Sequence, residues 1–390
     1  MAQSISQEAI GATGLPGATA ASRHAGATTS GAPTTGTFAV GDYVVDQTGA
    51  MYVCTVAGTP GTWQLSGVSV NENIAGKNLV INGGMDIWQR GTSFANLYNT
   101  YTADRWQNYS GVTGITLSQV ASGLTGFSYA LRSQRNSGGT STGTMYVGQS
   151  LESVNSIPFA GKTATFSFYA RCGSNFSPTG SQITATLQYG TGTDNNIYSG
   201  FTGGTAIVTA ATTLTTSWQR FTYTATFAST STQIGFYFSS VPTGTAGAND
   251  YFDITGVQLE IAPQATPFSR AGGSIGGELA LCQRYYWQVG AGVLCPAVAI
   301  STSNLYGYVY TPVSMRLSPP TVTAYTLVIQ NAGFTGYSSV TTASSLSISN
   351  GSSNIVGINF TSNVTSYSVG SNNWISQNNG SSYLSLSAEL

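Results

Sequence analysis

The sequence predicts an all-β protein, and three observations lead to that class. Thr, Val, Tyr and Phe, which favour a pleated backbone, recur in short runs, and Gly, Asn and Ser separate these runs as turns. Hydrophobic residues make up 41% of the 390 residues, which is enough for several domains to bury a core. Charged residues make up only 6%, against about 25% in an ordinary soluble domain. We therefore expect β modules whose hydroxyl and amide groups keep the surface hydrated.

Charge and cysteine pattern exclude several classes of function. The net charge of −1 provides no basic field to collect nucleic acid or anionic lipid. Cys54, Cys172, Cys282 and Cys295 form no CxxC pair and have no nearby histidine, so we expect buried free thiols. No apolar run is long enough to span a bilayer, and the first ten residues lack a signal-peptide pattern. These features predict a chain made and kept in a cytosol until assembly.

The N-terminal part divides into three segments. Residues 1–36 are mostly Gly, Ala, Thr and Ser, which cannot bury enough surface to offset their ordering entropy, so we expect an extended attachment arm. Residues 37–68 alternate strand-like segments with turns and predict a small β module. So short a module buries little surface, which favours oligomerisation. Residues 69–77 are expected to be a linker.

The rest of the chain predicts two larger β domains with a helix between them. Residues 78–270 carry regular short strands, which indicate an antiparallel jelly roll or β-sandwich. Residues 271–294 are expected to be a linker helix, and residues 295–390 return to short strands and predict a C-terminal β-sandwich tip.

The predicted helix runs from 276 to 289 and carries an apolar stripe. Leu279, Cys282, Tyr286 and Val289 recur at three- and four-residue intervals. Packing of this stripe about a threefold axis predicts a parallel homotrimer and a fibrous molecule.

Three segments carry a resemblance to bacteriophage tail proteins. GTFAVGDYVVDQTGAMYVCTVAGTPGTW (36–63) is similar to a short module near the N-terminus of many phage minor tail and fibre proteins. NLVINGGMDIWQRGTSF (78–94) together with FDITGVQLEIAPQATPFSR (252–270) resembles the jelly-roll domain of phage tail proteins and, more distantly, carbohydrate-binding modules. GGELALCQRYYWQV (276–289) followed by YTPVSMRLSPPTVT (310–323) looks like the helix and tip domain of phage fibres.

The resemblance implies a structural virion protein, a minor tail or tail fibre protein that presents β domains to the host cell surface and its glycans. Such chains are commonly trimers, attached to tail or baseplate proteins by the N-terminal part, here residues 1–36. Two alternatives stay open. One is a fibre that cleaves glycans with Asp104, Asp250, Asp253 or Glu260 in a cleft, and the other is a capsid decoration or spacer fibre without receptor contact.

The sequence favours a protein that is not an enzyme. The single histidine, His24, lies in the predicted arm, where it has no pocket in which to activate a nucleophile. Glycan cleavage needs two carboxylates across a cleft, but the 13 acidic residues lie mostly at turns and strand ends. We therefore expect no catalytic residues.

Two sites for other ligands are expected. Carbohydrate-binding jelly rolls of the kind that this chain resembles often hold a structural Ca²⁺ between the first and last strands, which here would place Asn82, Asp86 and Asp253 around the ion. No other cofactor is expected. Sugar binding uses aromatic faces beside amide and hydroxyl groups, and in the last domain Tyr306, Tyr308, Tyr310 and Trp374 are the candidates for exposure.

Overall fold

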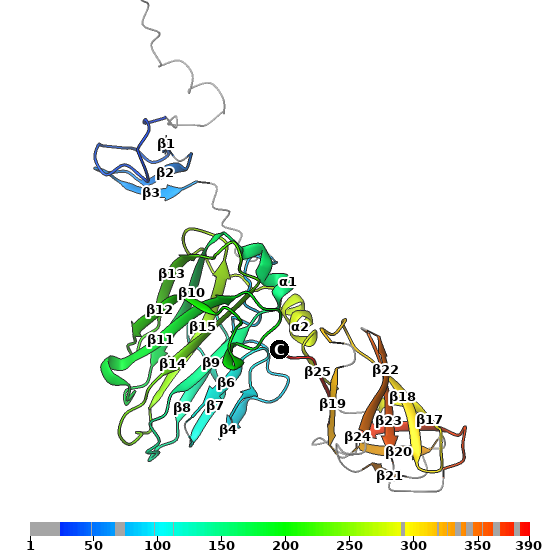
Figure 1. Cartoon of the computed structure of the whole chain (residues 1–390). Coiled ribbons are helices and arrows are strands. Elements are labelled where there is room, and N and C mark those ends of the chain that lie inside the picture. The colour runs from blue at the N-terminus through cyan, green and yellow to red at the C-terminus, as the bar shows by residue number, and fades with distance from the viewer. Residues whose placement is uncertain are drawn as a thin grey trace, which may run out of the picture. The chain divides into compact units, whose positions relative to one another are not determined.

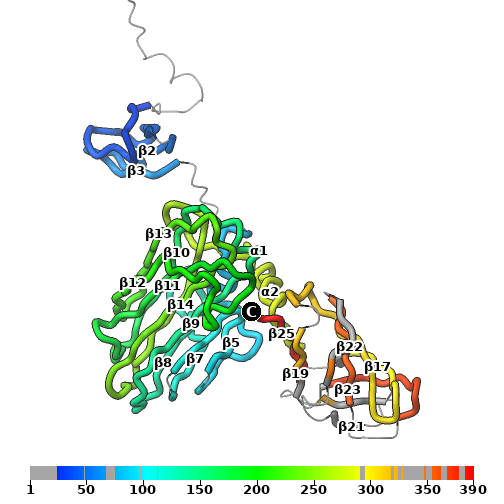
Figure 2. The backbone as a smooth tube through the Cα atoms, in the orientation of Figure 1, coloured from blue at the N-terminus to red at the C-terminus, as the bar shows by residue number. Residues whose placement is uncertain are grey.

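The computed structural model describes most of the chain in two compact units, residues Met1–Asn71 and Glu72–Leu390. The described residues are 24–47, 49–66, 75–96, 98–111, 113–289, 293–317, 320–325, 327–331, 337–340, 346–352, 354–361, 367–377 and 383–390. Residues 1–23 of the predicted arm and 69–74 of the predicted linker lie outside this description. Figures 1 and 2 trace the two units.

The first unit contains a three-stranded antiparallel sheet in the order β1-β2-β3. The strands are β1 (Tyr43–Val45), β2 (Met51–Val56) and β3 (Thr62–Leu65). Val44 and Cys54 are its buried apolar residues. His24, from the predicted arm, forms a parallel bridge with Tyr43, and Ala25 donates a backbone hydrogen bond to the same residue. The described part of the arm therefore begins beside β1.

The second unit contains a sandwich of two six-stranded antiparallel sheets, so the all-β prediction is confirmed. The first sheet, in the order β13-β10-β15-β8-β7-β4, consists of β4 (Ser93–Ala95), β7 (Ile115–Ala121), β8 (Tyr129–Arg135), β10 (Thr163–Cys172), β13 (Gln219–Thr226) and β15 (Tyr251–Glu260). The second, in the order β12-β11-β14-β9-β6-β5, consists of β5 (Thr100–Tyr101), β6 (Gln107–Ser110), β9 (Met145–Ser150), β11 (Gln182–Gly190), β12 (Thr205–Thr213) and β14 (Gln233–Ser240).

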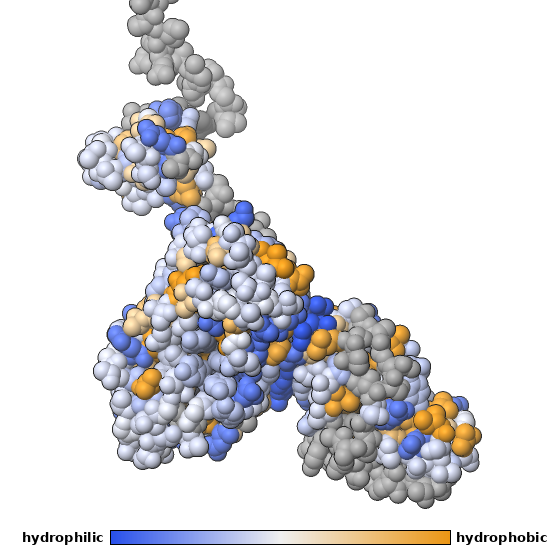
Figure 3. Space-filling view, in the orientation of Figure 1, coloured by the Kyte–Doolittle hydropathy of each residue, from blue (hydrophilic) through white to orange (hydrophobic). Residues whose placement is uncertain are grey.

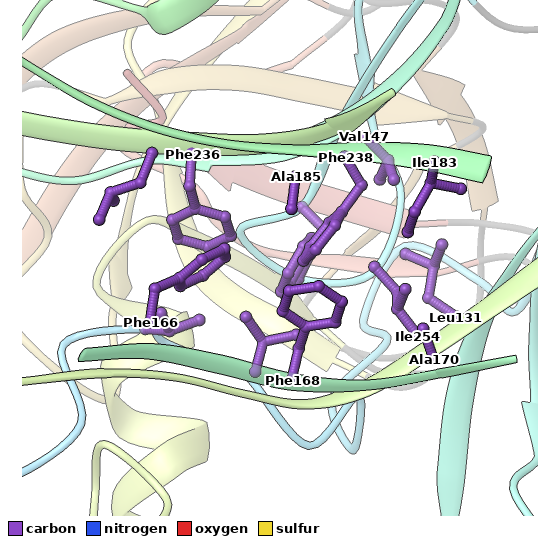
Figure 4. Close-up of a cluster of buried hydrophobic side chains, with 14 of the residues drawn as sticks. Leu131, Val147, Phe166, Phe168, Ala170, Ile183, Ala185, Phe236, Phe238 and Ile254 are labelled. Carbon is purple, nitrogen blue, oxygen red and sulfur yellow. The ribbon is translucent and has the colours of Figure 1, made fainter. Parts of the chain in front are cut away.

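Aromatic side chains from both sheets fill the space between them. Phe166 and Phe168 lie two residues apart on β10 and therefore share the inner face, as do Phe236 and Phe238 on β14. The rings of Phe168 and Phe238 meet edge to face at 4.6 Å between centroids, and those of Phe166 and Phe236 meet at a tilt, at 5.2 Å. Figure 4 shows these rings interleaved with aliphatic side chains. Burial of this cluster supplies the main apolar driving force of the sandwich.

The outer surface reflects the composition of the chain. Figure 3 shows that much of the described surface in view is pale, near the middle of the hydropathy scale, with strong blue or orange confined to patches. On β11, for example, Thr184 points outward and is half-buried, whereas its neighbours Ile183 and Ala185 are buried. Hydroxyl groups thus cover faces that charged residues cover in other proteins.

The helix after the sandwich is shorter than predicted. Helix α2 spans Ile275–Gln283, and the other α-helix described, α1, spans Ser153–Ser156. The segment Tyr286–Val289 is strand β16, which pairs with β25 (Tyr383–Ser387). The prediction of helix through residue 289 was wrong because backbone pairing with a strand far along the chain outweighs the local apolar spacing. Among the described residues, no helix has the length and apolarity that crossing a membrane requires.

The apolar stripe assigned to this helix does not form a continuous exposed seam. Cys282 is fully buried and packs with Tyr285, Ile81 and Ile87 inside the chain. Tyr286 is buried on β16, beyond the end of the helix. The stripe therefore gives no support to a trimer, which stays a prediction based on the small core of the first unit.

The strands from β16 to β25 form what we call the C-terminal module. One sheet has three strands in the order β16-β25-β19, with β19 at Thr321–Tyr325. The other has the order β21-β20-β24-β17-β18-β23-β22 and consists of β17 (Val293–Ala299), β18 (Asn304–Tyr310), β20 (Leu327–Asn331), β21 (Tyr337–Val340), β22 (Leu346–Ser352), β23 (Ile355–Thr361) and β24 (Asn372–Gln377). The core of the C-terminal module includes Leu305, Ile358, Phe360, Ile375 and Leu384.

The four cysteines are free and buried, as predicted. Cys172 belongs to the core of the sandwich and Cys295 to that of the C-terminal module, and Cys54 and Cys282 are buried at the positions described above. Burial raises the pKa of the Cys295 thiol to about 12, so it stays protonated and behaves as a small apolar side chain.

Candidate functional site

The outer face of the seven-stranded sheet of the C-terminal module carries an aromatic groove. Strand β18 alternates strictly, with Leu305 and Val309 buried in the core and Tyr306 and Tyr308 on the opposite face. Register places Tyr306 opposite Val298 of β17, and Pro296 of β17 opposite Trp374 of β24. Directly opposed residues share a face, so the two tyrosines and the tryptophan lie on one surface.

This aromatic groove has a volume of about 390 Å³ and is lined by residues 296–298, 306–308 and 372–374. The rings of Tyr306 and Tyr308 meet edge to face, with centroids 5.0 Å apart. Tyr308 is 45% exposed and therefore presents ring surface to the solvent. A hydrogen bond with Tyr306 raises the pKa of the Tyr308 phenol, so the Tyr308 hydroxyl stays protonated near neutral pH.

Small and polar residues shape the groove between the rings. Gly307 lies between the two tyrosines, and a Cβ atom there would meet the carbonyl oxygen of Pro296 at 2.8 Å and the sulfur of Cys295 at 2.9 Å. Glycine is therefore required for the close packing of β17 against β18 beneath the groove. Asn372 is exposed at the groove, where its amide can donate and accept hydrogen bonds. None of the lining side chains is charged.

The structure thus brings together three of the four aromatic residues predicted for binding. Tyr306, Tyr308 and Trp374 line the groove. Tyr310 continues the same face of β18 and is 67% exposed, but it is not part of the lining. It pairs with Ile355 at the far end of β23.

The three residues predicted to hold calcium each have partners in the protein. The Asn82 amide donates to two backbone carbonyls, at 2.8 and 3.1 Å, and Asp86 pairs with Arg270 at 2.9 Å. Both carboxylate oxygens of Asp253 accept bonds from arginines. Nowhere in the part of the chain that the structure describes do three His, Cys, Asp or Glu residues gather as a metal site would require. The ion stays a prediction, and thermal unfolding with and without a chelator tests it.

The carboxylates considered for glycan cleavage are also engaged elsewhere. Asp104, Asp250, Asp253 and Glu260 are all buried. Asp250 pairs with Arg135 at 3.0 Å, and Glu260 accepts a bond from the backbone of Thr266 at 2.8 Å. A cavity of about 720 Å³ beside α1 and α2 has Glu260 as the one carboxylate in its lining. Neither this cavity nor the aromatic groove holds the pair of carboxylates that glycoside hydrolysis uses.

A second aromatic surface on the sandwich was not found from the sequence. Tyr109, Tyr146 and Tyr237 lie on the outer face of the second sheet, and Tyr198 joins them from a 3₁₀ turn. The rings of Tyr109 and Tyr198 stack at 5.1 Å between centroids, and burial raises the pKa of Tyr198 well above its usual value. Alternation places each tyrosine outward, but only the pairing of β6 with β9 and β14 gathers them. That pairing is not visible in the sequence.

No family model matches the chain, and no curated protein matches it.

Solved structures match the fold weakly. A CBM4 module is 20% identical over 46% of this chain and 98% of its own, with a TM-score of 0.31. The CBM22-1 xylan-binding domain from Paenibacillus barcinonensis Xyn10C is 14% identical over 49% of this chain and 98% of its own, with a TM-score of 0.30. The enzymatically active domain of tailspike protein 4 of bacteriophage CBA120 is 13% identical over 48% of this chain and 22% of its own, with a TM-score of 0.31. Similarity at this level assigns the chain neither a family nor a ligand.

Proposed function

We propose that this chain is a structural component of a phage virion, a minor tail or tail fibre protein, and that its aromatic groove contacts glycans of the host cell surface. The virion role follows the resemblance of residues 36–63 and of the framing segments 78–94 and 252–270 to phage tail proteins. The glycan role depends on one structural observation, the groove that Tyr306, Tyr308 and Trp374 form on the C-terminal module.

The chemistry of the groove suits a neutral sugar. Aromatic rings offer apolar faces that can cover the C–H surface of a pyranose, and the phenols and the Asn372 amide can exchange hydrogen bonds with its hydroxyls. The volume of about 390 Å³ is in the range for small ligands, and an uncharged lining does not select for an ionic group. A short stretch of a neutral glycan is therefore the ligand that the groove fits best.

Single alanine variants of the full chain test the groove. Binding to an array of bacterial cell-envelope glycans should weaken about tenfold in Tyr308→Ala and Trp374→Ala, as expected for loss of an aromatic anchor. Tyr310→Ala is the matched control, because Tyr310 has the same side chain on the same strand face but does not line the groove. It should bind within about twofold of the parent chain.

Two outcomes would contradict the glycan role. One is that the parent chain binds no glycan of the array. The other is that Tyr310→Ala loses as much affinity as Tyr308→Ala, since the effect would then belong to the exposed strand and not to the groove.

We further propose that residues 1–36 attach the chain to other tail or baseplate proteins and that the assembled molecule is a homotrimer. The small buried core of the first unit, Val44 and Cys54, supports the need for additional packing partners. Light scattering should give three times the chain mass. A chain without residues 1–36 should fold and yet fail to enter particles, and normal incorporation would reject the attachment role.

The proposal includes no catalytic step. The carboxylates that the cleaving alternative would need are buried and bonded, as described above. An assay for new reducing ends after incubation with envelope glycans separates binding from cleavage. Release of reducing ends would favour the depolymerase alternative.

A further inference from the structure

A ladder of two arginines and one aspartate crosses the outer face of the first sheet of the sandwich. Register places Arg171 of β10 opposite Asp253 of β15, and Asp253 opposite Arg132 of β8. The chain neighbours Ala170, Ile254 and Leu131 point into the core, as Figure 4 shows, so the ladder residues occupy the opposite face. We call these three residues the arginine ladder.

One buried carboxylate holds both guanidinium groups of the arginine ladder. Arg132 donates to the two oxygens of Asp253 through Nε at 2.8 Å and Nη2 at 3.0 Å, and Arg171 donates through Nε at 2.9 Å. Asp253 is fully buried, whereas the side chains of Arg132 and Arg171 are 21% and 24% exposed. The guanidinium groups therefore cover the carboxylate and face the solvent.

Each guanidinium group of the arginine ladder lies over an aromatic ring. The guanidinium carbon of Arg132 lies 3.5 Å from the ring centroid of Tyr251, and that of Arg171 lies 4.7 Å from the ring centroid of Trp218. Trp218 is itself fixed by a hydrogen bond of its indole to the carbonyl of Ser122, at 2.9 Å. Stacking and ion pairing together restrict the rotamers of both arginines, which lowers the entropy that binding would cost.

The charges of the ladder do not cancel. Two guanidinium groups share a single carboxylate, so the ladder carries a net charge of +1. Within the described part of the chain, the Nη groups of Arg171 donate no hydrogen bond, and no second carboxylate pairs with either arginine. Partly exposed, preorganised guanidinium donors with unmatched charge can recognise a carboxylate or a phosphate.

We propose that Arg132 and Arg171, with the rings of Tyr251 and Trp218, form a second binding site, for a sugar polymer that carries carboxylate or phosphate groups. The donors of Arg171 bind the anionic group, the charge of Arg132 adds to the attraction, and the flanking rings offer apolar surface to the sugar. This site is independent of the aromatic groove, whose lining has no charged side chain. The sandwich would then bind anionic sugar polymers, whereas the aromatic groove binds neutral glycans.

Titration of the full chain with three probes tests the site. Oligogalacturonate supplies carboxylates, a glycerol phosphate oligomer supplies phosphates, and a maltooligosaccharide supplies neither. At least one anionic probe should bind, and more weakly as salt is raised, because part of the attraction is a screened charge interaction. Which of the two binds distinguishes the carboxylate from the phosphate. The neutral probe should not compete with the anionic one.

Variants then locate the binding. Arg171→Gln should weaken the anionic probe about tenfold, as expected for loss of a charge-assisted hydrogen bond. Arg132→Gln should weaken it about fivefold, because it removes a nearby positive charge. Arg270→Gln is the matched control, because the substitution removes the same charge from an arginine that is 26% exposed and pairs with one aspartate. It should change affinity by about twofold or less. Tyr308→Ala should leave anionic binding unchanged, which separates this site from the aromatic groove.

Three results would overturn the proposal. Failure of both anionic probes to bind the parent chain is the first, and an equal loss in Arg270→Gln, which would indicate general charge attraction, is the second. Arg171→Lys provides the third, and it also covers the case in which Arg171→Gln does not fold. Arg171→Lys keeps a positive charge beside Asp253 but loses the planar guanidinium group, so the anionic probe should bind this variant several-fold more weakly. Binding with the affinity of the parent chain would reject the role of Arg171.

Discussion

The carboxylate of Glu389 lies 2.8 Å from the guanidinium of Arg90, although 299 positions separate the two residues in the sequence. The same carboxylate binds Arg105, which is fully buried and stacks on Tyr285 at 3.6 Å. Burial alone would lower the pKa of Arg105, and the charge of Glu389 raises it above its usual value. This ionic cluster joins the end of the C-terminal module to the sandwich within the second unit.

Loss of the Glu389 carboxylate should destabilise the second unit. Glu389→Gln leaves the buried charge of Arg105 without its counterion, and breaking such a pair costs about 3 kcal/mol of unfolding free energy. Urea unfolding of the full chain measures the change.

Asp86→Asn is the control for that variant. It removes the same kind of charge from an ion pair of 2.9 Å, but Arg270, its partner, is partly exposed to water. Asp86→Asn should lower the unfolding free energy by about 1 kcal/mol or less. Equal costs in the two variants would mean that burial of Arg105 does not matter.

Asp104 should make the stability of the chain depend on pH in a defined direction. Burial raises the pKa of its carboxyl to about 6, and Arg90 and Gln89 offset only part of this effect. Because the folded pKa is above the unfolded value of about 3.9, protonation favours folding. This contribution is complete below about pH 4 and is lost as the pH rises through about 6.

Asp104→Asn removes this dependence. A shift of about two pKa units corresponds to about 3 kcal/mol, so the stability of the variant relative to the parent chain should rise by about that amount between about pH 4 and about pH 7. Urea unfolding at several pH values measures it. If the unfolding free energies of the two proteins changed in parallel with pH, Asp104 would titrate in the folded chain as it does in the unfolded chain.

Two adjacent glycines of α2 should respond oppositely to alanine. A Cβ atom at Gly276 would meet nothing within 4 Å, so Gly276→Ala should stabilise the chain by roughly 0.5 kcal/mol through helix propensity. A Cβ atom at Gly277 would lie 2.2 Å from the carbonyl oxygen of Gly272. Gly277→Ala should therefore destabilise by about 1–3 kcal/mol, as overpacking does. Thermal unfolding of both variants measures the changes in stability. If both variants were stabilised, or both destabilised, the close approach of α2 to Gly272 would be contradicted.

The sequence alone determined the β class and the face on which most strand residues lie. The sequence named Tyr306 and Tyr308 as candidates for exposure, and because side chains alternate along a strand, both lie on the face of β18 opposite the buried Leu305 and Val309. The spacing of the cysteines, with no CxxC pair and no nearby histidine, likewise predicted buried free thiols. These are local properties, because each depends on a residue and its near neighbours in the chain.

Only the tertiary structure decided where elements end and which residues meet. The apolar spacing through residue 289 favoured a helix, but pairing of β16 with β25 converts Tyr286–Val289 into a strand. Trp374 joins the tyrosines of the groove because β17 lies between β18 and β24, an order that no local pattern encodes.

Asp253 illustrates the same limit for a charged residue. The sequence shows a carboxylate in a strand, and resemblance suggested a calcium ion beside it. The register of β10, β15 and β8 places Arg171 and Arg132 on either side of it, which the sequence did not indicate. Strand register is set by the burial of whole faces and by distant backbone pairing, so the partners of a strand residue follow from the complete fold and not from its neighbours in sequence.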